Sequence, residues 1–194
     1  VWFEDAETRE HVESLLAPRA EVLPFRLVRE PEPSERFRTC VPILPREIAA
    51  GRVGDSLGAS DLPDLADGWA ELGDGRRLKD GMFVAQVRGD SMNEKIPDGA
   101  WCLFGAPPEG SRAGRVVAVC HARIDDPDYG GSFTVKQYHS EKVHGDDGGF
   151  RHSRIELRPL STNPAYRSIV LMPEDEGEVR VLGEFLEVLG REGA

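Results

Sequence analysis

Short runs of apolar residues, divided by turns rich in Gly, Pro and Asp, fill the chain from about residue 37 onward. The length of these runs is typical of strands, and several alternate between apolar and polar positions. We expect strands at 83–87, 100–104, 115–122, 132–139, 154–160, 168–172 and 179–189. Many short strands with little helix between them predict a mostly β domain of mainly antiparallel strands.

The first 36 residues have a different pattern. Residues 5–17 place apolar side chains on one helical face and end before a proline, so they predict a short helix. A possible strand at 22–28 follows, and a proline-rich, charged stretch then has the composition of a linker. We therefore divide the chain into an N-terminal arm and linker, 1–36, and a β domain, 37–194.

Composition narrows the class of protein. The chain has 194 residues, 39% of them hydrophobic, and a formal net charge of −11, which argues against direct binding to duplex DNA. It contains no apolar run long enough to span a membrane and no basic stretch typical of a signal peptide. The cysteines Cys40, Cys102 and Cys120 are odd in number and form no CxxC pair. We expect reduced thiols in a cytoplasmic protein, with Cys102 and Cys120 buried in apolar runs.

Candidate chemistry begins in the stretch QVRGDSMNEKIPDGAWCLF, residues 86–104, where Ser91 follows a strand in a glycine-containing turn. Such a serine is either an ordinary turn residue or a nucleophile. A possible partner is Lys136, which lies in a β-type run with Thr134 and Tyr138 on the same face. An amine removed from water favours its neutral form, which can accept a proton from a serine hydroxyl. The alternative is a lysine that extends to water from an edge strand.

Four motifs in one order give the pattern a family resemblance. The segments VRGDSMNEKIPDG, FTVKQY, IELRPLSTNPAY and VRVLGEFLEV resemble the C-terminal peptidase domain of the LexA repressor family, whose relatives include UmuD and phage repressors. The resemblance implies a LexA-like fold in which Ser91 is the nucleophile and Lys136 the general base. Backbone N–H groups of Ser91 and Met92 would then stabilise the oxyanion.

The same family cuts its own chain at an Ala-Gly bond. The segment VPILPREIAAGRVGDS resembles the family's pattern of an apolar, proline-containing strand that leads to such a bond. The resemblance places the cleavage site at Ala50–Gly51, in a loop at about 41–54, although a surface turn is the alternative for so short a motif. It further implies a regulatory switch in a stress or DNA-damage (SOS) response, a homodimer, and a RecA–single-stranded DNA filament as the activator.

The sequence is also compatible with other functions. The domain could be a non-proteolytic dimerisation or partner-binding module with a LexA-like fold, or a peptidase that acts on another protein in trans. A metal site would need ligands from Cys120, His121, His139, His144 and His152. Their spacing matches no known ligand motif, and we expect these histidines on the solvated surface. We expect no metal, no cofactor and no contact with a membrane.

Overall fold

The computed structural model describes residues 23–45, 61–73, 75–121, 124, 133–144, 150–172 and 179–191, without the side chains of 143, 144 and 150–152. The expected helix at 5–17 lies outside these residues. The mostly β fold is confirmed, since all pairings between the named strands are antiparallel and the described part holds one short helix, α3 (Leu62–Leu65). No helix in the described ranges has the length and apolar character needed to cross a membrane.

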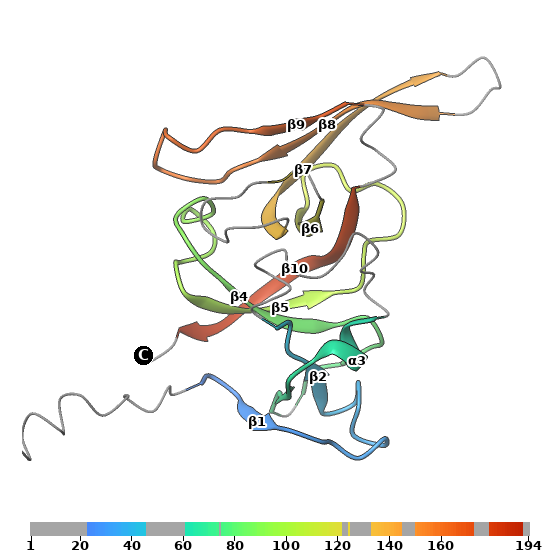
Figure 1. Ribbon diagram of the computed structural model, residues 1–194, viewed down its shortest axis with the longest axis vertical. Coiled ribbons are helices and arrows are strands. Elements are labelled where there is room, and N and C mark those ends of the chain that lie inside the picture. The colour runs from blue at the N-terminus through green and yellow to red at the C-terminus, as the bar shows by residue number, and fades with distance from the viewer. Residues whose placement is uncertain are drawn as a thin grey trace, which may run out of the picture.

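The larger sheet contains one strand for each of the apolar runs after residue 80 (Figure 1). Its seven strands are β4 (Phe83–Val87), β5 (Ala100–Gly105), β6 (Val116–Cys120), β7 (Phe133–His144), β8 (Phe150–Arg158), β9 (Ile169–Leu171) and β10 (Arg180–Arg191). Their order across the sheet is β4-β5-β10-β6-β7-β8-β9. Strands β7 and β8 are longer than expected and pair as a hairpin that extends away from the body of the molecule (Figure 1).

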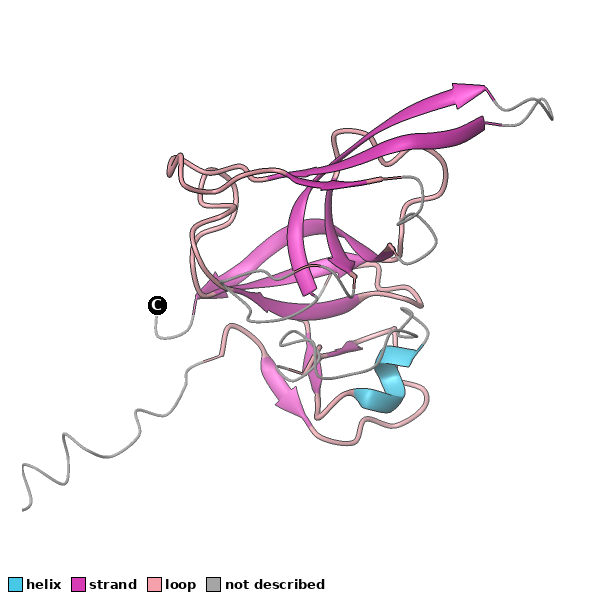
Figure 2. Ribbon diagram, turned by 45° about the horizontal axis from the view of Figure 1, so that its top comes forward, coloured by secondary structure: helices cyan, strands magenta, loops and turns pink. Residues whose placement is uncertain are grey.

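A smaller sheet lies beside the larger one and contains β1 (Arg26–Val28), β2 (Cys40–Pro42) and β3 (Trp69–Glu71), with β3 in the middle. Helix α3 lies on this side of the molecule (Figure 2). The strand expected in the arm is thus joined to the β domain through β1 and β3. After β2 the chain runs parallel to β4: Ile43 is paired with Val84, and the Leu44 N–H donates a hydrogen bond to the Val84 carbonyl oxygen at 2.7 Å.

Three apolar clusters form the core, and alternation along the strands divides residues among them. On β4, Phe83 and Ala85 pack into the central cluster, where Phe83 stacks on Phe104 with ring centroids 5.1 Å apart. Val84, on the other face of β4, packs with Trp101 and the small sheet. A third cluster lies against β6, β7 and β8. Strand β4 is therefore buried on both faces, which explains its continuous apolar sequence.

Strand β10 joins the two halves of the large sheet because it pairs with β5 on one side and β6 on the other. Its register shifts by a residue at several places along these pairings. At Gly183 the carbonyl oxygen of Gly105 and the ring of Phe83 occupy the space that a Cβ would need. Only glycine fits this close approach without moving the neighbouring strand.

The cysteines are all free thiols, but their burial differs in part from expectation. Cys102 is buried as predicted, whereas Cys120, the last residue of β6, is half-exposed. Cys40, which lies outside any long apolar run, is buried as the first residue of β2, all of whose residues are buried in the small sheet. Burial raises the pKa of the Cys102 thiol to about 12, so this thiol is not ionised at neutral pH.

Candidate active site

Ser91 lies in the connection from β4 to β5, and this connection is tied down within itself. Gly89 has φ 76°, a backbone conformation that favours glycine, and its N–H donates to Asp98 Oδ1 at 2.7 Å. Met92 and Ile96 are fully buried in the central cluster. The Ile96 N–H also donates to the Met92 carbonyl oxygen at 2.7 Å. Packing and hydrogen bonds therefore hold the turn that carries Ser91 in place.

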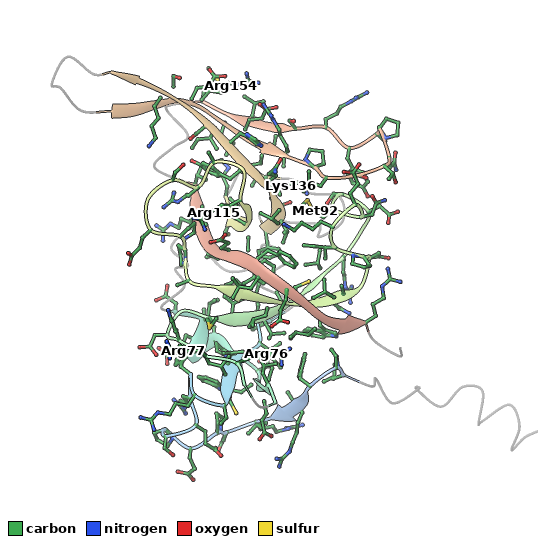
Figure 3. The ribbon with its side chains drawn as sticks, turned by 180° about the vertical axis from the view of Figure 1, so that it is seen from behind. Arg76, Arg77, Met92, Arg115, Lys136 and Arg154 are labelled. Atoms are coloured by element: carbon green, nitrogen blue, oxygen red, sulfur yellow. The ribbon has the colours of Figure 1, made fainter. Side chains whose placement is uncertain are left out.

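Lys136 reaches Ser91 from strand β7, 45 residues along the chain. Its Nζ donates hydrogen bonds to Ser91 Oγ at 2.9 Å and to Thr134 Oγ1 at 2.7 Å. Figure 3 shows Lys136 beside Met92, the residue that follows the serine. The expectation that Ser91 and Lys136 lie within hydrogen-bond reach is confirmed.

The surroundings of Lys136 contradict the alternative of a surface lysine. Ser91 and Lys136 are each 2% exposed, and Thr134 is fully buried. Strand β7 is also not an edge strand, because β6 pairs with it on one side and β8 on the other. Lys136 sits opposite buried Val117 in the β6–β7 register. The amine is thus held by two hydroxyl groups inside the sheet and does not extend to water.

The backbone around Ser91 offers hydrogen-bond donors. In the described part of the chain, the N–H groups of Ser91 and Met92 donate to no acceptor, whereas the neighbouring Asp90 N–H donates to the Tyr166 hydroxyl at 3.3 Å. Successive free N–H groups beside a nucleophile can stabilise the negative charge that develops on a carbonyl oxygen under attack. The constellation of hydroxyl, amine and free N–H groups has the parts that acyl transfer requires.

Sequence reasoning placed Thr134 on the face of Lys136 but gave it no role; its position two residues before the lysine in a strand was the available signal. It quoted the loop at 160–166 within a family motif but missed its contacts with the serine turn through Asn93, Glu94 and Asp90. The expected cleavage bond, Ala50–Gly51, lies outside the described residues, as does its loop from residue 46 onward.

The histidines do not form a metal site in the part of the chain that the structure describes, where no group of three or more His, Cys, Asp or Glu side chains could hold an ion. The expectation of solvated histidines is wrong for His121, which is buried beside the end of β6. His139 lies within β7, and its Nε2 is 3.0 Å from Gln137 Oε1.

Comparison with known protein families gives a match. A family model described as Peptidase S24-like matches residues 42–186, a range that begins at the last residue of β2 and includes the serine turn, Lys136 and most of β10. No curated protein sequence matches the chain.

Proposed function

Because the chain belongs to the Peptidase S24-like family of LexA- and UmuD-type serine peptidases, we propose that it cuts its own chain between Ala50 and Gly51. The observation that carries the proposal is the 2.9 Å contact between Ser91 Oγ and Lys136 Nζ in a buried site. No other titratable group is needed as the base in a serine–lysine pair. The family match supports a serine peptidase in general, and the contact supports this particular pair.

In the proposed reaction Ser91 Oγ attacks the carbonyl carbon of Ala50, and its proton passes to the neutral amine of Lys136 along their hydrogen bond. Thr134 Oγ1, 2.7 Å from the amine, orients it. The free N–H groups of Ser91 and Met92 would stabilise the oxyanion. Lys136 then gives the proton to the nitrogen of Gly51 as the peptide bond breaks, and water releases Ala50 from the acyl-enzyme.

The position of the cleavage bond is supported by the chain that leads to it. Ile43 pairs with Val84 in a parallel direction, so the chain leaves the described residues heading the same way as β4, toward Ser91. The offset between the paired residues is 84 − 43 = 41, and the offset between Ala50 and Ser91 is also 91 − 50 = 41. A segment that kept this direction and stayed extended would carry Ala50 past the end of β4 and toward the turn that holds Ser91.

The family resemblance extends the proposal to a regulatory role. Cutting at Ala50–Gly51 would break the covalent link between the N-terminal fragment and the rest of the domain, to which β1 and β2 are still paired through β3, and so act as a switch in a stress or DNA-damage response. We further propose a cytoplasmic homodimer whose cleavage is promoted by a RecA–single-stranded DNA filament. An activator of this kind needs no catalytic group of its own, because it only has to favour the docked state of the cleavage segment.

The test is a time course of the purified protein from pH 7 to pH 10, with the products identified by mass spectrometry. We expect fragments 1–50 and 51–194, faster formation at higher pH because a general base acts only in its unprotonated form, and a rate independent of protein concentration. Ser91→Ala and Lys136→Met should each abolish the cut. Gly51→Lys should block it without altering the Ser91–Lys136 pair.

Three results would change the assignment. An uncut wild-type chain at every pH, also with activator present, would indicate a non-proteolytic binding module. A rate that rises with protein concentration would indicate cleavage in trans. Fragments that persist in Ser91→Ala would mean that a contaminating protease makes the cut, and the proposal would be wrong.

A further inference from the structure

The strand pairings of the large sheet do not by themselves explain why Ser91 and Lys136 lie so close together. Ser91 follows β4, which is an edge strand of the sheet, and Lys136 lies on β7. Between β4 and β7 lie β5, β10 and β6. A small change in twist across these strands would add up over the sheet and separate the two side chains. Met92 and Ile96 share the central cluster with Phe133 and Val135 of β7, but this apolar packing is not directional, and hydrogen bonds that connect the two segments would fix the distance more closely.

That connection is the loop at 160–166, which joins β8 to β9 and lies against the serine turn (Figure 1). The Thr162 N–H donates to Asn93 Oδ1 at 2.9 Å, and Asn93 Nδ2 donates to Thr162 Oγ1 at 3.1 Å. The Glu94 N–H donates to the Leu160 carbonyl oxygen at 3.0 Å. The two residues that follow Met92 are thus bound to the loop through backbone and side chain.

Tyr166 binds the serine turn on the other side of Ser91. Its hydroxyl accepts a hydrogen bond from the Asp90 N–H at 3.3 Å. The loop that presents Tyr166 is itself stiffened by Asn163. Its Oδ1 accepts from the Ala165 N–H at 3.0 Å, and its carbonyl oxygen accepts from the Tyr166 N–H at 3.3 Å. Ser91 is therefore bracketed by Asp90 on one side and Asn93 on the other.

The other end of the loop leads directly to the lysine. Strand β8 ends at Arg158, which is paired with Gln137, the neighbour of Lys136 on β7. Two residues later, Leu160 receives the hydrogen bond from Glu94. The path from lysine to serine through this loop crosses one strand pairing, whereas the path through the sheet crosses four, β4-β5, β5-β10, β10-β6 and β6-β7.

We propose that the loop at 160–166 is a positioning clamp, which holds Ser91 at hydrogen-bond distance from Lys136 through the Asn93–Thr162 pair and the Tyr166 hydroxyl. None of these three side chains touches the serine hydroxyl in the contacts described, so their role is positioning and not catalysis. Loss of one such contact should cost little stability, since water can replace it at the partly exposed loop. It should nevertheless move the nucleophile, whose reactivity depends on fractions of an ångström.

The proposal rests on the pairing of Ser91 with Lys136 but not on the identity of the bond that is cut. It can therefore be tested without self-cleavage, in the Ser91→Cys variant. A cation beside a thiol lowers the pKa of the thiol. The pH midpoint of modification at position 91 by methyl methanethiosulfonate, followed by peptide mass spectrometry, then reports the proximity of the lysine. The Ser91→Cys/Lys136→Met variant is the reference, because it gives the pH midpoint of modification in the absence of the lysine.

We expect Asn93→Leu, Thr162→Val and Tyr166→Phe, each added to Ser91→Cys, to move the midpoint toward that of the Lys136→Met reference by about one pH unit. Thr162→Ser keeps the hydroxyl and should keep the parent midpoint. Ser111→Ala is the matched control, because it removes a hydroxyl that accepts from the Ala113 N–H in another loop. Thermal unfolding should show all of these variants folded.

Folded clamp variants with the parent midpoint would overturn the proposal, because the pair would then keep its distance without the clamp. Equal midpoints for Ser91→Cys and Ser91→Cys/Lys136→Met would also overturn it. They would mean that Lys136 does not lie close to residue 91, so that there is no pair for the clamp to hold. A lysine-dependent midpoint that the clamp variants shift, in a wild-type protein that never cuts itself, would support the clamp and overturn the proposed function instead.

Discussion

Removing two residues between β2 and the proposed cleavage bond should abolish self-cleavage, because the segment has little spare length. Six residues lead from Leu44, fixed beside Val84, to Ala50, and seven lead from Val84 to Ser91. At about 3.3 Å per extended residue these paths span at most about 20 Å and about 23 Å. The second path is not extended throughout, because β4 ends at Val87 and the chain then turns toward Ser91, but the segment must still stay largely extended to bring the bond to the nucleophile.

Deleting Arg46 and Glu47 would shorten the segment by about 7 Å, whereas the reacting atoms must approach to about 3–3.5 Å. We expect the rate of cleavage at Ala50–Gly51 to fall at least about 100-fold. Replacing the same two residues with Ala-Ala keeps the length and removes the side chains, so it should cleave at close to the wild-type rate. The assay is a gel time course at pH 9 with intact-mass analysis.

Equal rates in the deletion and the Ala-Ala variant would refute this reasoning. The cleavage segment would then reach Ser91 by a route that does not follow β4, and the matching offsets of 41 residues would have no structural meaning. Loss of cleavage in both variants would instead assign a role to the side chains of Arg46 or Glu47.

Three further predictions concern stability and reactivity. Gly183→Ala should lower the free energy of unfolding by about 1–3 kcal/mol, measured by urea denaturation, whereas Gly73→Ala, with open space around its Cβ position, should have a much smaller effect. The hydrogen bond from Arg158 lowers the pKa of Glu156 from 4.5 to about 2, so its contribution to stability is complete above pH 4.5 and is lost as the pH falls toward 2. Arg158→Gln should therefore reduce stability at pH 7 only slightly, because the pair is partly exposed, and the difference should shrink as the pH falls toward 2 and vanish below it. Iodoacetamide at pH 8 should leave Cys102 unmodified in the native protein, and rapid modification there would mean that the core opens readily.

The sequence predicted the large sheet well because each of its strands carries an apolar run that the core requires. It missed β3, whose three residues are too few to show a period. It also ended β7 too early, at 139, since Ser140, Glu141 and Lys142 have the composition of a turn, and it began β8 too late, at 154. These residues pair across a two-stranded ribbon with little core to cover, and so no apolar alternation marks them.

Ser91 and Lys136 could be predicted because a lysine in an apolar strand is unusual and because the motifs around both residues resemble one family. Their proximity could be expected only from the family resemblance, since the pattern of residues does not show how β4, β7 and the intervening strands are arranged. The contacts of Asn93 and Thr162 were not predictable either. Both are ordinary turn residues, and nothing in a single sequence separates a turn amide that binds another loop from one that binds water.

The position of β10 has a consequence for how the protein acquires activity during synthesis. Strands β5 and β6 are joined only through β10, and β10 starts 180 − 105 = 75 residues after β5 ends. At about 5–20 residues per second, a ribosome needs about 4–15 s to make that stretch. Until β10 is inserted, the serine turn and the lysine strand belong to two separate halves of a sheet. The sheet that carries Ser91 at one side and Lys136 at the other is thus complete only when nearly the whole domain has been translated.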